Sequence, residues 1–364
     1  MLNLRKLFID VFDPQPGETA AVLVDLPDGN LTDTDEWKRR RAMAERWHAA
    51  LSELGRERDF AVVPMISYAA RGMNNGPLPA TGRQDGKSIV LEEVAAGATL
   101  FLVLTEFSAS APLIALTKQF PQLRTASMPR IAPEMESSAL GADYTHVARS
   151  CARLRDRLAK ACMADIEFST GDHFRFDFRF RKAEVDDGHL PMTAPAPRLI
   201  NLPSGEAFIA GYEGEKGVAS ETSGVLPIPW QNGIVRARVV QNRVEEVVGD
   251  TPASSDLRDF LFADAARCNV AELGLGCNPM ARVWGNVLED EKAGPHIALG
   301  RSEHLGGTVG PSAFREARNV WHEDFVYARG CPVQVVRMEL VDEAGGRTPL
   351  FANGSYTADL EIGI

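Results

Sequence analysis

The chain lacks several features that mark whole classes of protein. Its 364 residues contain no uninterrupted run of 18 apolar residues, and no G-x-G-x-x-G follows the first strand-like segment. A membrane-spanning helix and a dinucleotide-binding fold are therefore not expected. The five cysteines are odd in number and show no C-x-x-C spacing, which favours free thiols in a reducing cytosol over disulfides. Because the first 18 residues also lack the apolar stretch of a signal peptide, we expect a cytoplasmic protein.

The chain also contains fewer basic than acidic residues. Lys and Arg number 39 against 50 Asp and Glu, which gives a formal net charge of -11. An acidic chain repels phosphate backbones and anionic lipid surfaces, so nucleic acid and membranes are not expected as partners. Hydrophobic residues make up 45% of the sequence, and the length is sufficient for two domains, each with its own core.

The first half of the chain alternates strand-like and helix-like segments. Strands are predicted at residues 20–27, 60–68, 99–107 and 123–131, and helices at 35–55, 111–120 and 143–163. Strands that alternate with helices form βαβ units, and hence a parallel sheet covered on both faces. Alternating phenylalanines at 164–182 predict a hairpin. We expect an α/β N-terminal domain over residues 1–190.

A stretch rich in Asp, Gly and Pro at residues 183–198 interrupts this pattern and predicts the domain boundary. Beyond it, strand-like segments dominate, with one clear helix at 255–267. The sequence therefore predicts an α+β C-terminal domain over residues 199–364.

Two histidines of this second domain stand in suggestive contexts. His322 and Asp324 lie in an aromatic, β-branched segment that favours a strand, where side chains two residues apart share one face. An imidazole and a carboxylate side by side are good ligands for a divalent metal. His296 follows a Gly-Pro turn and opens an apolar run, which suits either a ligand at a strand entrance or a partly buried structural histidine.

Two glutamates lie in or beside apolar segments, where burying a charged carboxylate costs free energy. Glu206 follows a Pro-Ser-Gly turn and precedes an apolar run, and Glu272 lies inside the apolar segment VAELGLG. A buried carboxylate requires a paired charge or a metal. Both a metal site and a salt bridge to an arginine remain open for Glu272.

Taken together, four segments resemble one family. N-x-P-x-G-E, N-x-A-E-x-G-x-G, D-E-(x)4-H-I-A-L-G and H-x-D occur in this order within roughly residues 200–352. This arrangement is similar to that of the thermophilic metallo-aminopeptidases of the aminopeptidase T and aminopeptidase S type. The resemblance implies a two-domain fold, a homodimer, and a catalytic C-terminal domain with two divalent metal ions (Zn, Co or Mn). It also implies a peptide or small-molecule substrate, hydrolysed at its N-terminal residue by metal-activated water.

The resemblance assigns roles to seven residues of this sequence. The implied metal ligands are Glu206, Glu272, His296, His322 and Asp324, and the implied catalytic residues are Glu291 and Glu303. Glu291 matches a position that the family keeps acidic, and a spare carboxylate there could carry the proton to the leaving amine. Glu303 stands where the family has a tyrosine, so this chain lacks the phenolic donor at that position.

Two other classes of function remain open. Relatives similar to 2,5-dihydroxypyridine dioxygenase use the same fold for ring cleavage at one ferrous ion, and His296, His322 and Asp324 would supply two histidines and one carboxylate. Those relatives replace the glutamates that match Glu206 and Glu272, whereas this chain keeps both. A binding protein with a vestigial metal site is the third possibility.

Overall fold

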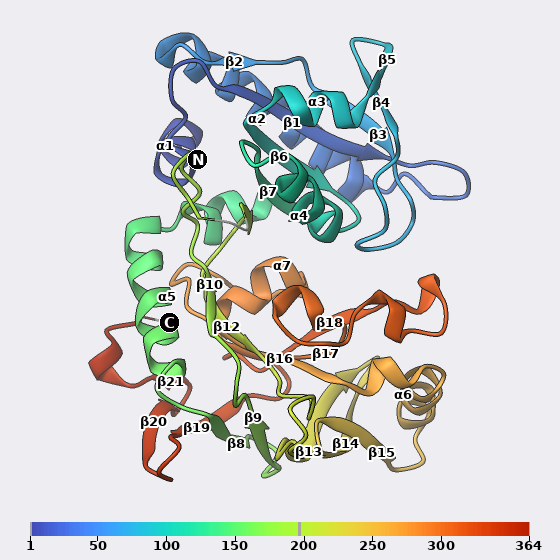
Figure 1. Cartoon of the computed structure of the whole chain (residues 1–364), viewed down its shortest axis with the longest axis vertical. Coiled ribbons are helices and arrows are strands. Elements are labelled where there is room, and N and C mark those ends of the chain that lie inside the picture. Colours follow the sequence, from blue (N-terminus) through green and yellow to red (C-terminus); the bar gives the residue numbers. More distant parts are fainter. Residues whose placement is uncertain (1, 196–197, 364) are drawn as a thin grey trace. The chain divides into compact units, whose positions relative to one another are not determined.

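A computed structural model describes residues 2–195 and 198–363. The chain divides into two compact units (Figure 1). Unit 1 comprises Met1–Ala148 and Asp186–Ser204, and unit 2 comprises Arg149–Val185 and Gly205–Ile364. Each unit has its own sheets and its own core, and the chain has the mixed α/β character expected from the sequence.

Unit 1 is built on an eight-stranded sheet with the order β11-β7-β6-β1-β3-β4-β5, and β2 also pairs with β1. The strands are β1 (Thr19–Leu26), β2 (Ala61–Val62), β3 (Ile66–Ala69), β4 (Thr81–Gln84), β5 (Lys87–Val90), β6 (Leu100–Thr105), β7 (Arg124–Pro129) and β11 (Leu199–Asn201). β11, β7, β6, β1 and β3 run parallel, and β4 and β5 extend the sheet antiparallel.

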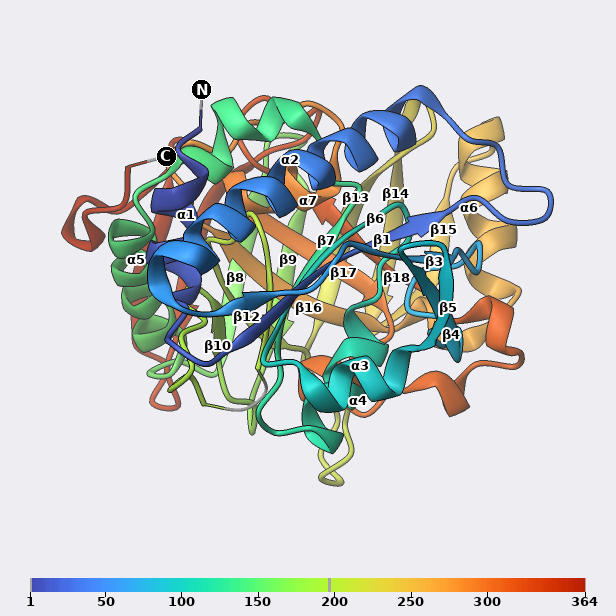
Figure 2. The ribbon, with the colours of Figure 1, turned by 90° about the horizontal axis from the view of Figure 1, so that it is seen from above.

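Helices cover both faces of this sheet, as the βαβ pattern predicts. They are α1 (Leu4–Phe12), α2 (Asp35–Arg58), α3 (Leu91–Gly97) and α4 (Ser110–Gln119). α2 lies across one face, and α3 and α4 lie on the other (Figure 2). Thr34 caps α2 by accepting a hydrogen bond from the Trp37 amide, and Asp59 ends the helix in the left-handed conformation.

Unit 2 contains two sheets. The larger has the order β15-β14-β13-β9-β8-β19-β20-β21, and the smaller has the order β10-β12-β16-β17-β18. The larger sheet consists of β8 (Met163–Phe168), β9 (His173–Asp177), β13 (Ser223–Trp230), β14 (Gly233–Val240), β15 (Arg243–Val248), β19 (Val335–Val341), β20 (Arg347–Ala352) and β21 (Ser355–Tyr356). The smaller consists of β10 (Glu184–Asp186), β12 (Glu206–Ala210), β16 (Val270–Gly276), β17 (Pro295–Gly300) and β18 (His322–Val326).

Short helices complete unit 2. α6 (Pro252–Phe262) packs on β14 and β15, and α7 (Val287–Asp290) packs on β18 (Figure 1). The turn Glu291–Ala293 continues α7 and lies against β16. α5 (Tyr144–Leu158) begins in unit 1 and continues into unit 2 from Arg149 onward.

The division of the chain differs from the predicted boundary. Residues 149–185, which the sequence pattern assigns to the N-terminal domain, belong to unit 2. The reason is strand pairing: the predicted hairpin is β8 and β9, and β8 pairs along its length with β19 near the end of the chain. A local pattern predicts the hairpin but contains no information about this distant partner.

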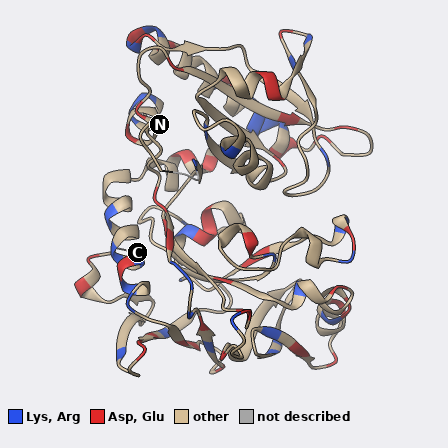
Figure 3. Cartoon of the chain, viewed as in Figure 1, with Lys and Arg blue, Asp and Glu red and all other residues tan. Residues whose placement is uncertain are grey.

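Other features concern the whole described chain. All five cysteines are buried, and none forms a disulfide within the described residues. No helix within residues 2–195 and 198–363 is long and apolar enough to cross a membrane. Acidic and basic residues are interspersed along the ribbon of both units (Figure 3).

Candidate metal centre

The smaller sheet of unit 2 carries all five predicted ligands. β12 begins at Glu206, β16 contains Glu272, β17 contains His296, and β18 contains both His322 and Asp324. β16 and β17 are buried along their whole length, so these polar groups lie within an apolar sheet. The structure therefore gathers residues that are up to 118 positions apart in the sequence on adjacent strands.

The strand register explains why the side chains meet. Glu272 pairs with Ala298, and Ala298 pairs in turn with Asp324, so the two carboxylates flank a single methyl group on one face of the sheet. His296 pairs with Gly274, where an added Cβ would lie 1.9 Å from the Nε2 atom of His296. The imidazole thus occupies the space that a side chain at residue 274 would need.

Glu272 lies between the two histidines. Its Oε1 atom is 3.9 Å from His296 Nε2, and its Oε2 atom is 3.4 Å from His322 Nε2. His322 Nε2 also lies 3.4 Å from Asp324 Oδ1, and His296 Nε2 lies 3.3 Å from Glu206 Oε2. Two groups of potential ligands therefore share one carboxylate, which offers a different oxygen to each. No arginine or lysine pairs with Glu272 in the part of the chain that the structure describes.

One of these groups meets the distance requirement of a metal site directly. Glu272, His322 and Asp324 each offer a ligand atom, and these atoms all lie within 4.8 Å of one another. His322 donates a hydrogen bond from Nδ1 to the carbonyl oxygen of Arg301 at 2.7 Å, which leaves Nε2 free to bind a cation. The ring of His296 is oriented in the same sense, with Nδ1 3.4 Å from the carbonyl oxygen of Gly294. The donor set and its orientation fit a divalent cation.

A buried lysine, not singled out from the sequence, completes the cluster. Lys292 is fully buried, and its Nζ atom lies 2.5 Å from Glu206 Oε1 and 2.6 Å from Glu291 Oε1. It lies in the turn against β16, where a Cβ at Gly276 would lie 2.1 Å from the backbone oxygen of Glu291. The sequence places Lys292 directly after Asp290 and Glu291, which could have indicated a buried ion pair. A lysine beside acidic residues is usually exposed, however, so this position alone does not predict burial.

Negative charge exceeds positive charge in this centre. Glu206 and Glu291 share the ammonium of Lys292. Glu272 and Asp324 face the imidazoles of the two histidines. Burial raises the pKa of Glu272, and burial together with the nearby carboxylates raises that of Glu291 well above its usual value. Burial opposes ionisation of Asp324 too, but His322 outweighs it and holds the Asp324 pKa below its usual range. A divalent cation would offset this excess of buried charge.

Glu303 lies apart from the predicted ligands. Arg301 binds its carboxylate through two hydrogen bonds of 2.6 and 2.8 Å, and 40% of the Glu303 side chain is exposed. Its neighbour His304 instead packs its ring on that of His322, with 5.0 Å between centroids. Burial lowers the pKa of His304 well below its usual value, and His322 and Arg301 lower it further.

A glutamate remote from the ligands fixes the loop that carries these residues. Glu213 accepts hydrogen bonds from Ser302 Oγ at 2.5 Å, from the Thr308 amide at 2.6 Å and from Asn269 Nδ2 at 3.0 Å. The backbone amide of Gly307 also bonds to the carbonyl oxygen of Ser302. The loop from residue 301 to 309 is therefore closed on itself and tied through Glu213 to Asn269, the residue before β16. Nothing in the local sequence around Glu213 indicates this contact.

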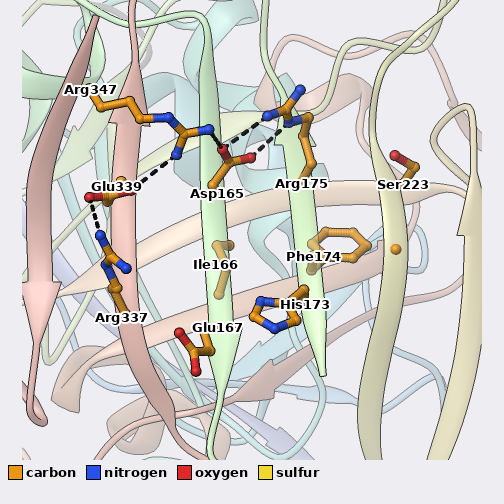
Figure 4. Close-up of a pocket in the computed structure, with 11 residues that line it drawn as sticks. Asp165, Ile166, Glu167, His173, Phe174, Arg175, Ser223, Arg337, Glu339 and Arg347 are labelled. Atoms are coloured by element: carbon orange, nitrogen blue, oxygen red, sulfur yellow. Dashed lines mark hydrogen bonds and ion pairs between the residues drawn. The ribbon is translucent and has the colours of Figure 1, made fainter. Parts of the chain in front are cut away.

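A separate cavity of about 390 Å³ lies on the larger sheet (Figure 4). Its charged lining comes mainly from Asp165, Arg175, Arg337, Glu339 and Arg347. These groups pair with one another, for example Arg175 with Asp165 at 2.7 Å and Arg347 with Glu339 at 3.0 Å. The cavity contains none of the predicted ligands, and its charges are mutually neutralised.

Comparison with known proteins places the fold. No family model and no curated protein matches the sequence. Among solved structures, 2,5-dihydroxypyridine dioxygenase from Pseudomonas putida KT2440 superposes with a TM-score of 0.64 at 14% identity, over 98% of this chain and 97% of that one. Wild-type AmpT from Thermus thermophilus superposes with a TM-score of 0.59 at 15% identity, over 98% and 99%. The chain shares its fold with both enzymes.

The metal-free centre predicts a pH-dependent stability. Burial lowers the pKa of His322, but Asp324 and Glu272 outweigh burial and raise it well above its usual value. The imidazolium therefore stabilises the fold fully below about pH 6.5, and this contribution is lost as pH rises through the folded pKa. We expect the urea midpoint of chelator-treated protein to fall between about pH 6 and pH 9. His322→Gln should flatten this slope, and an equal slope in the variant would contradict the assignment.

Proposed function

We propose that this protein is a metal-dependent aminopeptidase that hydrolyses the N-terminal residues of peptides at a two-cation centre. The supporting observation is the position of Glu272, which offers one oxygen to the side of His296 and the other to the side of His322. A carboxylate in this arrangement suits two neighbouring cations rather than one. The homodimeric state and the cytoplasmic location expected from the sequence belong to this proposal.

Each cation would have its own ligands in this centre. Glu206 and His296 would hold one, His322 and Asp324 the other, and Glu272 would contact both. When bound, such a pair lowers the pKa of water and polarises a carbonyl oxygen. The orphaned Oε2 atom of Glu206, which is buried without a hydrogen-bond partner, supports its place in the set.

Glu291 is the proposed proton carrier. Its side chain is only 13% exposed, and burial raises its pKa well above the usual value, which favours a carboxyl group that exchanges protons. It would take a proton from the attacking water and pass it to the amine nitrogen as the peptide C–N bond breaks. Lys292 would hold Glu291 and Glu206 in place through its ammonium group. Glu303, bound to Arg301, has no assigned step.

A ferrous ring-cleaving dioxygenase is the second candidate. The observation that favours it is the set of two histidines and one carboxylate formed by His296, His322 and Asp324, which is the usual ligand set of such iron sites. The retained carboxylates of Glu206 and Glu272 lie in the same cluster and add negative charge that one ferrous ion does not require. We therefore place this candidate second.

Metal content and turnover test the proposal together. We expect about two equivalents of Zn, Co or Mn per chain and release of p-nitroaniline from aminoacyl-p-nitroanilides, both lost after chelation and restored by metal. The measurements are elemental analysis of the purified protein and absorbance kinetics. One equivalent of iron with oxygen uptake on hydroxypyridines would favour the second candidate, and no turnover with any of these metals would refute the first.

A further inference from the structure

The imidazole of His304 is a polar group next to the centre that the ligand set does not use. Its Nδ1 atom is buried and has no hydrogen-bond partner, and the nearest carboxylate oxygen, Glu303 Oε2, is 3.9 Å away. Its ring packs edge-on against that of His322, and 20% of its side chain is exposed. A buried ring nitrogen without a partner is costly, and such groups call for a specific explanation.

Contacts of the loop from residue 301 to 309 determine the position of the His304 ring. Glu213 fixes Ser302, two residues before His304, and Arg301 holds the Glu303 carboxylate through two hydrogen bonds. His304 lies in the single helical turn Glu303–Leu305, so residues 303 and 304 point in different directions. The loop therefore presents the imidazole, and not the carboxylate of Glu303, to the side of His322.

We propose that His304 is a catalytic residue that donates an N–H hydrogen bond to the reacting carbonyl oxygen of the peptide bound at the centre. This inference rests on the proposed aminopeptidase function and names a donor within it. An imidazole donates a hydrogen bond through a protonated ring nitrogen. As water adds, the carbonyl oxygen gains negative charge, and a fixed donor stabilises it more than it stabilises the substrate.

The test compares His304→Ala with wild-type enzyme on leucyl-p-nitroanilide, using the metal that supports turnover. We expect kcat to fall about 100-fold with KM changed less than about threefold, because the bond strengthens in the transition state. Metal content and the unfolding temperature should stay unchanged. By calorimetry, the aminophosphonic acid analogue of leucine, which has a tetrahedral anionic centre, should bind at least about tenfold more weakly, and leucine itself equally well.

His173→Ala is the matched control, because this histidine is exposed on β9 of the same unit, and it should leave every readout unchanged. His304→Asn, which keeps an N–H donor, should recover part of kcat. A His304→Ala protein with wild-type kcat, or one that has lost metal, would overturn this inference and leave the proposed function standing. A wild-type protein without any turnover would remove both.

Discussion

Glu272→Gln is expected to lower kcat/KM by about three orders of magnitude, because a cation centre contributes several kcal/mol to stabilising the transition state. Glu272 is the residue that faces both His296 and His322. The amide keeps the shape of the side chain, so the strand pairing of β16 should persist. It removes the negative charge that two cations would share, and metal content should fall with activity.

Elemental analysis and kinetics on the same preparation check this expectation. Glu246→Gln serves as the matched control, since Glu246 is exposed on β15 and pairs with Arg238 at the surface. This variant should keep both its metal and its turnover. Unchanged metal content in Glu272→Gln would show that the shared carboxylate is not a ligand.

The second large effect concerns stability. Lys292→Met should lower the free energy of unfolding of the metal-free protein by about 3–5 kcal/mol, the usual cost of removing one partner from a buried ion pair. The substitution preserves most of the side-chain volume but leaves Glu206 and Glu291 without their shared cation. Saturating divalent metal should restore part of the loss, because it supplies positive charge to the same carboxylates.

Urea unfolding with and without metal measures both effects. Lys182→Met, at an exposed position, is the control for the substitution itself and should change the unfolding free energy by less than about 0.5 kcal/mol. If Lys292→Met were as stable as wild type without metal, the buried carboxylates would have to be protonated instead of paired. The account of Lys292 as their counter-ion would then be wrong.

Part of this centre follows from short-range patterns. The strand over His322 and Asp324 was predicted, and the period of two that places both side chains on one face is seen in β18. An apolar strand containing Glu272 is likewise observed in β16. These features depend on local periodicity and on the cost of burying charge, and a single sequence encodes both. Ligation itself stays a prediction.

Other parts depend on contacts that local patterns do not encode. The pairing of Lys292 with Glu206 joins residues 86 positions apart. Which of Glu303 and His304 faces the centre is decided by one tight turn and by the salt bridge to Arg301. The assignment of residues 149–185 to unit 2 rests on β8 pairing with β19. In each case the deciding partner lies elsewhere in the chain or in a loop without periodicity.

Two glycines of β16 limit which substitutions the centre can accept during evolution. Gly274 makes room for the His296 ring, and Gly276 makes room for the backbone of the turn that holds Lys292. Neither glycine has a side chain that could bind or react. A methyl group added at either position would nevertheless displace the His296 ring or the turn that carries Lys292. Mutational scans should therefore find these two inert positions as intolerant as the acids and histidines, and the ligands can be exchanged only among sequences that keep both glycines.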